Sequence, residues 1–399
     1  MSYNILAPAI KFTLCITTTL LLLFNSTTTA KPNEYGSKIL LSINEKNTLH
    51  KMLGQMIILG FKGTSIRDRN VKSIMQHIKK REIGGVIIET HNVLNPKQLK
   101  HLNRAILNTK SKSKHNLPTI IAVERDGGKF GCLSQKKGFK VYPRPYNMTK
   151  LTASKARRIY VHMSKNTKSL GFNMLLGPSL NISKKSDILN PHSTMFSKNI
   201  NTIVTYATEF IKAHKHNGLI TSVKYFPGQK YLNYSASDDD ADIITNWEEV
   251  EITPFKKIIN SNLSDSVMIG HTYNREVDEK RPSPLSHKTV HQLLKKQLKY
   301  KGVIVSDNLN KHIISKYCAP EKAAIQSILA GSDIIILAQQ QSNKKGKHLN
   351  KTKNIPNAIW KETLSILQKR NTQALFLKQR IIESYNKISK LKKKVLIAM

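Results

Sequence analysis

Short apolar runs rich in Ile, Val, Leu and Met recur along the chain, separated by longer segments with helical periodicity. There are eight such runs, at residues 56–60, 85–89, 119–124, 172–177, 219–226, 266–271, 302–307 and 333–337. Between them lie amphipathic segments such as 71–80, 96–107, 200–214, 247–259, 286–298 and 321–330. Strands that are apolar throughout and alternate with helices are typical of a parallel sheet covered on both faces.

Eight repeats of strand and helix predict a closed (β/α)8 barrel, the TIM barrel, rather than an open doubly wound sheet. We assign the barrel to residues 46–345, preceded by an N-terminal lead at residues 31–45. Residues 346–399 form a basic segment in which an amphipathic stretch at 355–394 predicts one or two helices. The predicted fold class is therefore α/β, a TIM barrel with a C-terminal helical extension.

The first thirty residues have a composition of their own. Lys11 precedes an apolar run at residues 12–24, and small residues follow up to Ala30. This order predicts a secretory signal peptide at residues 1–30, cleaved after Ala30. The run is short for a membrane span, although an uncleaved membrane anchor is the alternative. We therefore expect an exported protein, periplasmic or secreted.

Positive charge dominates the composition, with 65 Lys and Arg residues against 25 Asp and Glu and a formal net charge of +40. Such a field favours polyanions, including nucleic acid, anionic lipid surfaces and acidic wall polymers. The basic residues are spread along the chain, so a solvated basic surface accounts for them equally well. The chain carries no motif of interleaved aromatic and basic residues for stacking nucleic acid bases. We expect a monomer that could bind an anionic polymer or membrane surface.

Several motifs of other enzyme classes are missing from the sequence. It lacks the phosphate-binding GxxxxGK[ST], the dinucleotide glycine pattern, HExxH and GxSxG, which disfavours nucleotide-dependent and metal-dependent enzymes. Beyond the signal peptide the only cysteines are Cys132 and Cys318. They could form one bridge, but they do not make a disulfide scaffold.

Polar residues lie at or near the ends of several predicted strands: Glu89, Glu124, Lys224, His271 and Asp307. In a TIM barrel the carboxyl ends of all strands open onto one mouth, where the active site lies. These residues therefore predict a pocket with carboxylates, a cation and an imidazole. Such a pocket suits a ligand rich in hydroxyl groups.

These strand ends resemble the motifs of glycoside hydrolase family 3. Residues 302–309 read GVIVSDNL and resemble the family's nucleophile segment GxxxSDDL. The other matches are KYFPG at 224–228 to KHFPG, IAVERDGGK at 121–129 to xAVDQEGGR, MIGH at 268–271 to xxAH, PLS at 284–286 to the ATLS turn, and AGSD at 330–333 to AGAD. The motifs follow the family's order and cover about residues 50–340. Within the family the sequence is similar to single-domain bacterial β-N-acetylhexosaminidases, which remove N-acetylglucosamine from wall fragments.

The resemblance implies a TIM barrel, no cofactor or metal, and a retaining mechanism through a glycosyl-enzyme. It places Asp307 as the catalytic nucleophile and implies that Lys224, His271 and Glu124 contact sugar hydroxyls. Glu124 stands where the family has Asp. The implied activity is hydrolysis of O-glycosyl bonds in amino-sugar glycans derived from peptidoglycan.

Three departures from the family pattern bear on this activity. Tyr225 replaces the first His of the KHFPGHG motif, and His192 aligns with the family's substrate-binding Arg; we keep both as substrate contacts. The family's acid/base His belongs to an Asp-Ser-His triplet in the following loop, which here reads Ser-Ala-Ser at 235–237. A serine cannot act as a general acid near neutral pH without a base beside it.

Two hypotheses follow from the altered loop. One of the carboxyl groups of Asp238, Asp239 and Asp240 could supply the acid/base, since a desolvated carboxyl can be tuned for that role. Alternatively, the protein is a catalytically impaired pseudoenzyme that binds glycan or an anionic polymer without turnover.

Overall fold

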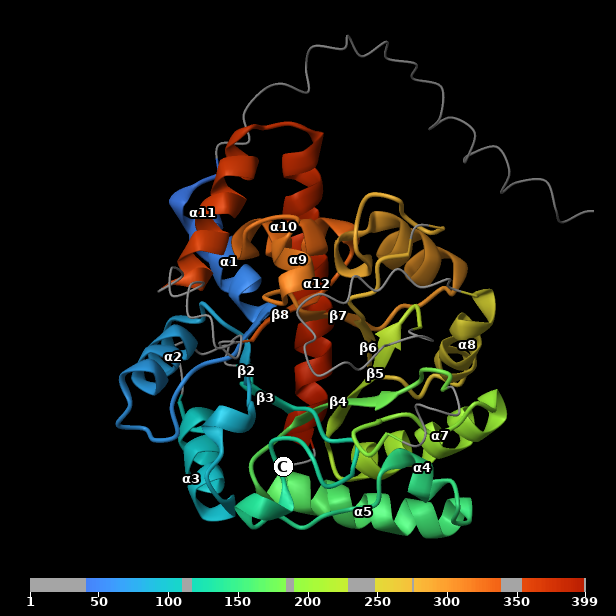
Figure 1. Cartoon of the computed structure of the whole chain (residues 1–399). Helices are drawn as coiled ribbons and strands as arrows, with labels where there is room; N and C mark the ends of the chain where they lie inside the picture. Colours follow the sequence, from blue (N-terminus) through green and yellow to red (C-terminus); the bar gives the residue numbers. More distant parts are fainter. Residues whose placement is uncertain are drawn as a thin grey trace, which may run out of the picture. The chain divides into compact units, whose positions relative to one another are not determined.

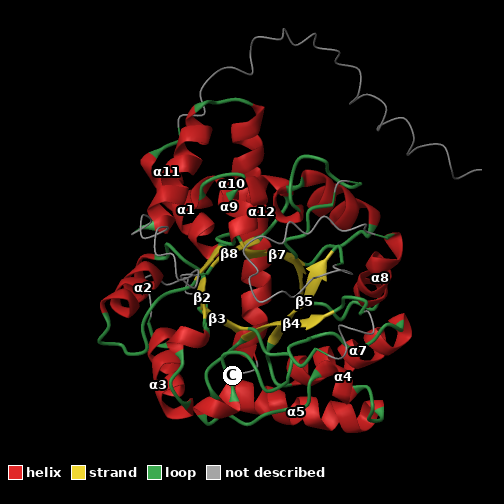
Figure 2. Cartoon of the chain, viewed as in Figure 1, coloured by secondary structure: helices red, strands yellow, loops and turns green. Residues whose placement is uncertain are grey.

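The structure is a computed structural model that describes residues 41–109, 117–183, 190–228, 248–274, 276–338 and 354–397. The chain divides into two units, Met1–Leu40 and Leu41–Met399, and the described residues all belong to the second. Its centre is a closed barrel of eight parallel strands that pair in chain order from β1 to β8, with β1 also paired to β8 (Figures 1 and 2). The strands are β1 Ile57–Leu59, β2 Gly85–Ile87, β3 Ile120–Val123, β4 Met174–Ser179, β5 Ile220–Phe226, β6 Ser266–Ile269, β7 Val303–Asn308 and β8 Ile334–Leu337.

Helices surround the ring of strands (Figure 2). They are α1 Ile43–Gln55, α2 Arg69–Lys80, α3 Pro96–Leu107, α4 Pro145–Met148, α5 Ala153–Ser169, α7 Ile200–His216, α8 Thr253–Asn260, the π-helix η6 Lys288–Gln297, α9 His312–Ser315, α10 Pro320–Ala330, α11 Ile355–Gln368 and α12 Thr372–Ile397. Short 3-10 turns are η2 Thr90–Asn92, η3 Gln135–Lys137, η4 Glu249–Ile252 and η5 Ser283–Leu285. The predicted TIM barrel with a C-terminal helical extension is therefore confirmed.

The strands are short and almost entirely buried, since one face packs inside the barrel and the other against the helices. Helix starts follow local signals. The hydroxyl of Ser42 accepts the amide N–H of Glu45 at 3.1 Å, and the Glu45 carboxylate accepts the amide of Ser42 at 2.9 Å, a capping box for α1. Asn95 caps α3, with Pro96 at its first position. Residues 31–45 were expected to be a lead, but α1 already begins at Ile43.

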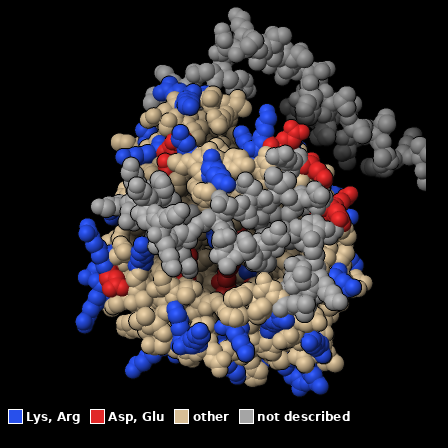
Figure 3. Space-filling view, in the orientation of Figure 1, with Lys and Arg blue, Asp and Glu red and all other residues tan. Residues whose placement is uncertain are grey.

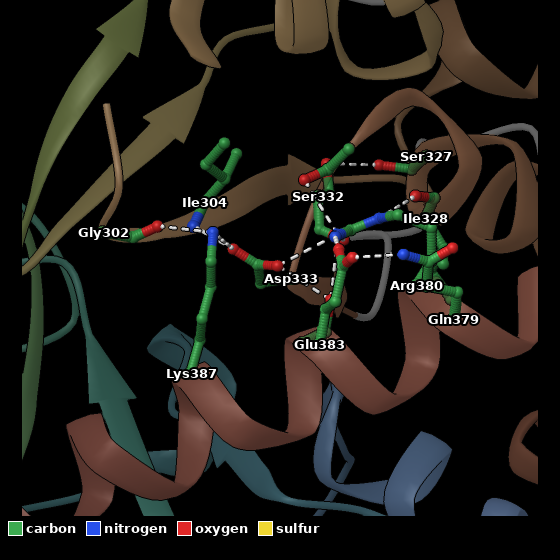
Figure 4. Close-up of polar contacts among 12 residues, drawn as sticks. Gly302, Ile304, Ser327, Ile328, Ser332, Asp333, Gln379, Arg380, Glu383 and Lys387 are labelled. Atoms are coloured by element: carbon green, nitrogen blue, oxygen red, sulfur yellow. Dashed lines mark hydrogen bonds and ion pairs between the residues drawn. The ribbon is translucent and has the colours of Figure 1, made fainter. Parts of the chain in front are cut away.

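The long helix α12 crosses behind the ring of strands in Figure 2, at the amino-terminal end of the barrel. Its polar side chains contact the segments that immediately precede the strands. The guanidinium of Arg380 and the ammonium of Lys387 bind the carboxylate of Asp333 at 3.0 and 3.3 Å, just before β8 (Figure 4). Lys387 also donates to the carbonyl of Gly302, before β7, at 3.1 Å.

Two further lysines of α12 extend this contact to the other side of the barrel. Lys392 donates to the side-chain oxygen of Gln55 at 2.8 Å, before β1, and to the carbonyl of Gly84 at 2.7 Å, before β2. Lys394 pairs with Asp265 at 2.9 Å, before β6. Helix α12 therefore closes the amino-terminal end of the barrel and leaves the carboxyl end as the mouth.

No helix among the described residues combines the length and the apolar character that crossing a bilayer requires.

Candidate active site at the barrel mouth

The carboxyl ends of β3, β5, β6 and β7 bring the predicted site residues to one mouth. Glu124 follows β3, Lys224 and Tyr225 lie near the end of β5, and His271 follows β6. Asp307 is the second-to-last residue of β7. These residues form two contact groups.

The first group centres on Asp307. Its Oδ2 lies 3.1 Å from Nδ1 of His271, and its Oδ1 accepts the amide N–H of Asn308 at 2.6 Å. Burial alone would raise the pKa of Asp307, but His271 and the Asn308 amide outweigh it, with a smaller effect of Lys311. The net pKa therefore lies below the ordinary value, and the carboxylate is ionised near neutral pH, as a nucleophile must be.

The second group centres on Lys224, whose side chain is 1% exposed. Its ammonium lies 2.9 Å from Oδ2 of Asp126 and 3.3 Å from Oε1 of Glu124. The hydroxyl of Tyr225 donates to the same oxygen of Glu124 at 3.3 Å. Burial opposes the charge of Lys224, but the two carboxylates outweigh it and raise its pKa well above the ordinary value. Lys224 is thus an ion-pair partner that orients Glu124, whose side chain is 53% exposed.

A pocket opens beside Glu124, lined by residues of the loop after β3 and of the segment before α7. Its wall carries Phe130, which is 51% exposed and stacks on the imidazole of His192 with ring centroids 3.8 Å apart. Lys140 and Tyr142 also line it. An aromatic face with a few polar groups around it is a common arrangement in small-molecule pockets.

Two members of the site were not singled out from the sequence. Asp126 lies within the segment 121–129 that was matched to the family, so the motif contained the signal. Phe130 carries no pattern of its own, because its role depends on stacking with a residue that is distant in sequence. Asp238, Asp239 and Asp240, proposed for the acid/base, lie outside the described residues.

Within the described parts of the chain, no group of three or more His, Cys, Asp or Glu side chains is placed to hold a metal ion. Both Cys132 and Cys318 are free thiols.

A closed parallel barrel with the carboxylate of Asp307 at the carboxyl end of a strand defines a TIM-barrel protein whose polar residues gather at the mouth where such barrels carry their active sites. The chain belongs to glycosyl hydrolase family 3, because the model of that family's N terminal domain matches residues 48–373.

Relatives with established names support this assignment. Beta-hexosaminidase A of Pseudoalteromonas piscicida is 25% identical over 330 residues, which cover 73% of this chain and 53% of that protein. The beta-hexosaminidase of Photobacterium profundum is 27% identical over 276 residues, which cover 69% of this chain and 78% of that protein. The chain thus spans about half the length of the first relative and most of the second.

Solved structures show the same fold. The β-N-acetylhexosaminidase from Beutenbergia cavernae superposes with a TM-score of 0.73 at 17% identity, covering 86% of this chain and 98% of that one. The family 3 β-N-acetylglucosaminidase from a Paenibacillus species gives a TM-score of 0.71 at 23% identity, covering 88% of this chain and 63% of that one.

Proposed function

We propose that this protein is a glycoside hydrolase of the β-N-acetylhexosaminidase type that cleaves amino-sugar glycans. The observation that carries the proposal is the setting of Asp307 at the end of β7, where its carboxylate contacts His271 and the amide of Asn308 and its pKa is lowered. The relatives named beta-hexosaminidase support the choice of sugar.

In the proposed retaining mechanism, an oxygen of Asp307 attacks the anomeric carbon and the glycosidic C–O bond breaks. The leaving oxygen takes up one proton from the acid/base. Water then attacks the anomeric carbon of the glycosyl-enzyme, which returns a proton to the acid/base and restores the carboxylate of Asp307. We propose that the proton donor belongs to residues 229–247, with Asp238 and Asp239 as its candidates. Glu124, held by Lys224, accepts hydrogen bonds from sugar hydroxyls.

We further propose that the stacked rings of Phe130 and His192 form the apolar wall against which the sugar ring lies. In this arrangement His192 contributes a flat surface where the family's Arg would contribute a charge. We also keep Tyr225 as a substrate contact, through the hydroxyl that it donates to Glu124.

Export and a polyanionic partner are parts of the same proposal. The leader at residues 1–30 supports export, and amino-terminal sequencing of the protein recovered outside the cytoplasm tests cleavage after Ala30. Lys and Arg side chains are spread over the face shown in Figure 3, with few Asp and Glu among them. We propose that this surface attracts the anionic wall polymer that carries the glycan, and binding that does not weaken with added salt would contradict this.

The decisive experiment is hydrolysis of an aryl β-N-acetylglucosaminide with an activated leaving group by the wild type and by Asp307→Asn. This leaving group needs little protonation, so the assay tests the nucleophile separately from the acid/base. We expect the substitution to lower kcat by about 10³-fold or more. Asp265→Asn is the matched control, because it makes the same chemical change at the opposite end of the barrel and should retain turnover.

Equal turnover by the wild type and Asp307→Asn would exclude Asp307 as the nucleophile. Sugar binding without turnover in the wild type would instead show the impaired pseudoenzyme.

A further inference from the structure

The imidazole of His271 has both ring nitrogens engaged within the protein. Nε2 lies 2.8 Å from the main-chain carbonyl oxygen of Asn308, and Nδ1 lies 3.1 Å from Oδ2 of Asp307. A carbonyl oxygen can only accept, so Nε2 carries a proton. The residue is 9% exposed, and neither nitrogen is left to bind a sugar hydroxyl.

The contact with Asp307 therefore requires a second proton. Without it, the lone pair of Nδ1 would face the lone pairs of a carboxylate oxygen, which is repulsive. The proton lies either on Nδ1, giving an imidazolium and a carboxylate, or on Asp307, giving two neutral groups. The other oxygen of Asp307 accepts the Asn308 amide at 2.6 Å, a hydrogen bond that favours the ionised form.

The other polar groups near Asp307 do not replace His271. Lys311 follows β7 and its positive charge favours the carboxylate of Asp307, with a smaller effect than that of His271. The hydroxyl of Tyr225 donates to Glu124. The negative charges of Glu124 and Asp126 are paired with Lys224. Among the described residues, His271 is thus the cation in direct contact with the carboxylate of Asp307.

We infer that His271 works as an imidazolium that orients Asp307 and holds it ionised, and that it is a positioning residue rather than a sugar contact. This inference rests on the proposed function, because it gives His271 a defined effect on the two steps of the retaining reaction. When Asp307 attacks, its C–O bond to the sugar forms and its negative charge disappears. When water cleaves that bond, the charge returns beside the imidazolium.

The imidazolium consequently stabilises free carboxylate more than the glycosyl ester. It makes Asp307 a better leaving group in the second step, since only interactions that differ between two states change the rate between them. Loss of the positive charge should slow hydrolysis of the glycosyl-enzyme, which will then accumulate when an activated aryl glycoside makes the first step fast.

His271→Gln separates charge from hydrogen bonding, because its neutral amide NH₂ group can still donate to the carboxylate of Asp307. The carboxylate then loses the extra stabilisation that a charged donor gives over a neutral one, so we expect a fall in kcat of about 10-fold. KM should fall with it, and a burst of aryl alcohol equal to the enzyme concentration should appear. If His271→Gln turned over at the rate of the wild type and showed no burst, the inference would be overturned.

The protonation state can be measured without activity, from the imidazole ¹⁵N chemical shifts of labelled protein at pH 7. We expect two protonated nitrogens for His271 in the wild type. In Asp307→Asn, where the new amide can donate to Nδ1, we expect one. A singly protonated His271 in the wild type would overturn the inference even in an active enzyme. If the wild type lacks turnover, the proposed function fails, and the chemical shifts still decide whether the ion pair exists.

Discussion

Arg380 on α12 offers a direct test of how the amino-terminal end of the barrel is held together. Only 3% of its side chain is exposed. Its guanidinium binds Asp333 at 3.0 Å and donates to the carbonyls of Gly331 and Ser332, each at 3.1 Å (Figure 4). Asp333 is fully buried, so it depends on these partners for its charge.

Replacement of Arg380 by Leu would leave the Asp333 carboxylate with Lys387 as its remaining cation and would remove the donor to three carbonyls, those of Ile328, Gly331 and Ser332. Removal of one partner of a buried ion pair costs about 3–5 kcal/mol, because the other charge stays buried. Domains are stabilised by only about 5–15 kcal/mol in total. Arg380→Leu should therefore remove a large part of the free energy of unfolding.

Urea unfolding followed by circular dichroism measures this loss as a lower midpoint at an unchanged slope. Arg157→Leu is the matched control, since Arg157 is 52% exposed and lies 3.7 Å from Glu209. An exposed pair of this kind is worth about 0–1 kcal/mol. A midpoint shift in Arg380→Leu no larger than that in Arg157→Leu would refute the reasoning that α12 clamps the barrel through buried charge.

Two further predictions concern single buried groups. Burial, with a smaller effect of Arg81, lowers the pKa of Lys392 to about 7, so the unfolded chain binds more protons than the native one between about pH 7 and 10. Relative to Lys392→Met, the wild type should gain free energy of unfolding in this window, on the order of 1 kcal/mol per pH unit. Urea unfolding at pH 7 and pH 9 measures this gain. Midpoints that change equally with pH in both proteins would contradict the prediction. In a chain that begins at residue 31, Ellman's reagent should label the half-buried Cys318 quickly and Cys132 only after unfolding, because burial and the charge of Glu124 raise the pKa of Cys132 to about 12. The assignment of rapid labelling to Cys318 would be wrong if no thiol of the wild type reacted quickly, or if a quickly reacting thiol remained in Cys318→Ser.

The barrel could be predicted from the sequence because its strands are apolar on both faces and each run stands between polar segments. Helix α5 was not singled out, because its buried stripe includes Ser164 and Thr167 and therefore has weak amphipathic contrast. Both hydroxyls are buried in hydrogen bonds to helix carbonyls, which no periodicity reveals. The contacts of α12 with the strand starts were equally invisible, since they join residues between 47 and 337 positions apart in the sequence.

The site was predictable where a strand ended in a distinctive residue, as at Asp307 and Lys224. The direction of each side chain was not predictable. The predicted sugar contact of Lys224 stays a prediction, and the structure shows in addition that its ammonium contacts Asp126 and Glu124. The stack of Phe130 on His192 depends on two loops that meet only in the folded barrel. Local patterns identify strand ends, whereas these contacts arise from tertiary packing.

The closure of the barrel by α12 also bears on the order in which the chain folds. The hydrogen bonds of Lys392 to Gln55 and Gly84 join residues 337 and 308 positions apart. Contacts of such separation form late and slowly, because the whole intervening chain must first be brought together. A chain made from its amino terminus onward holds its first strands ready well before α12 exists. The barrel therefore cannot lock its first strands in place until α12 has been delivered.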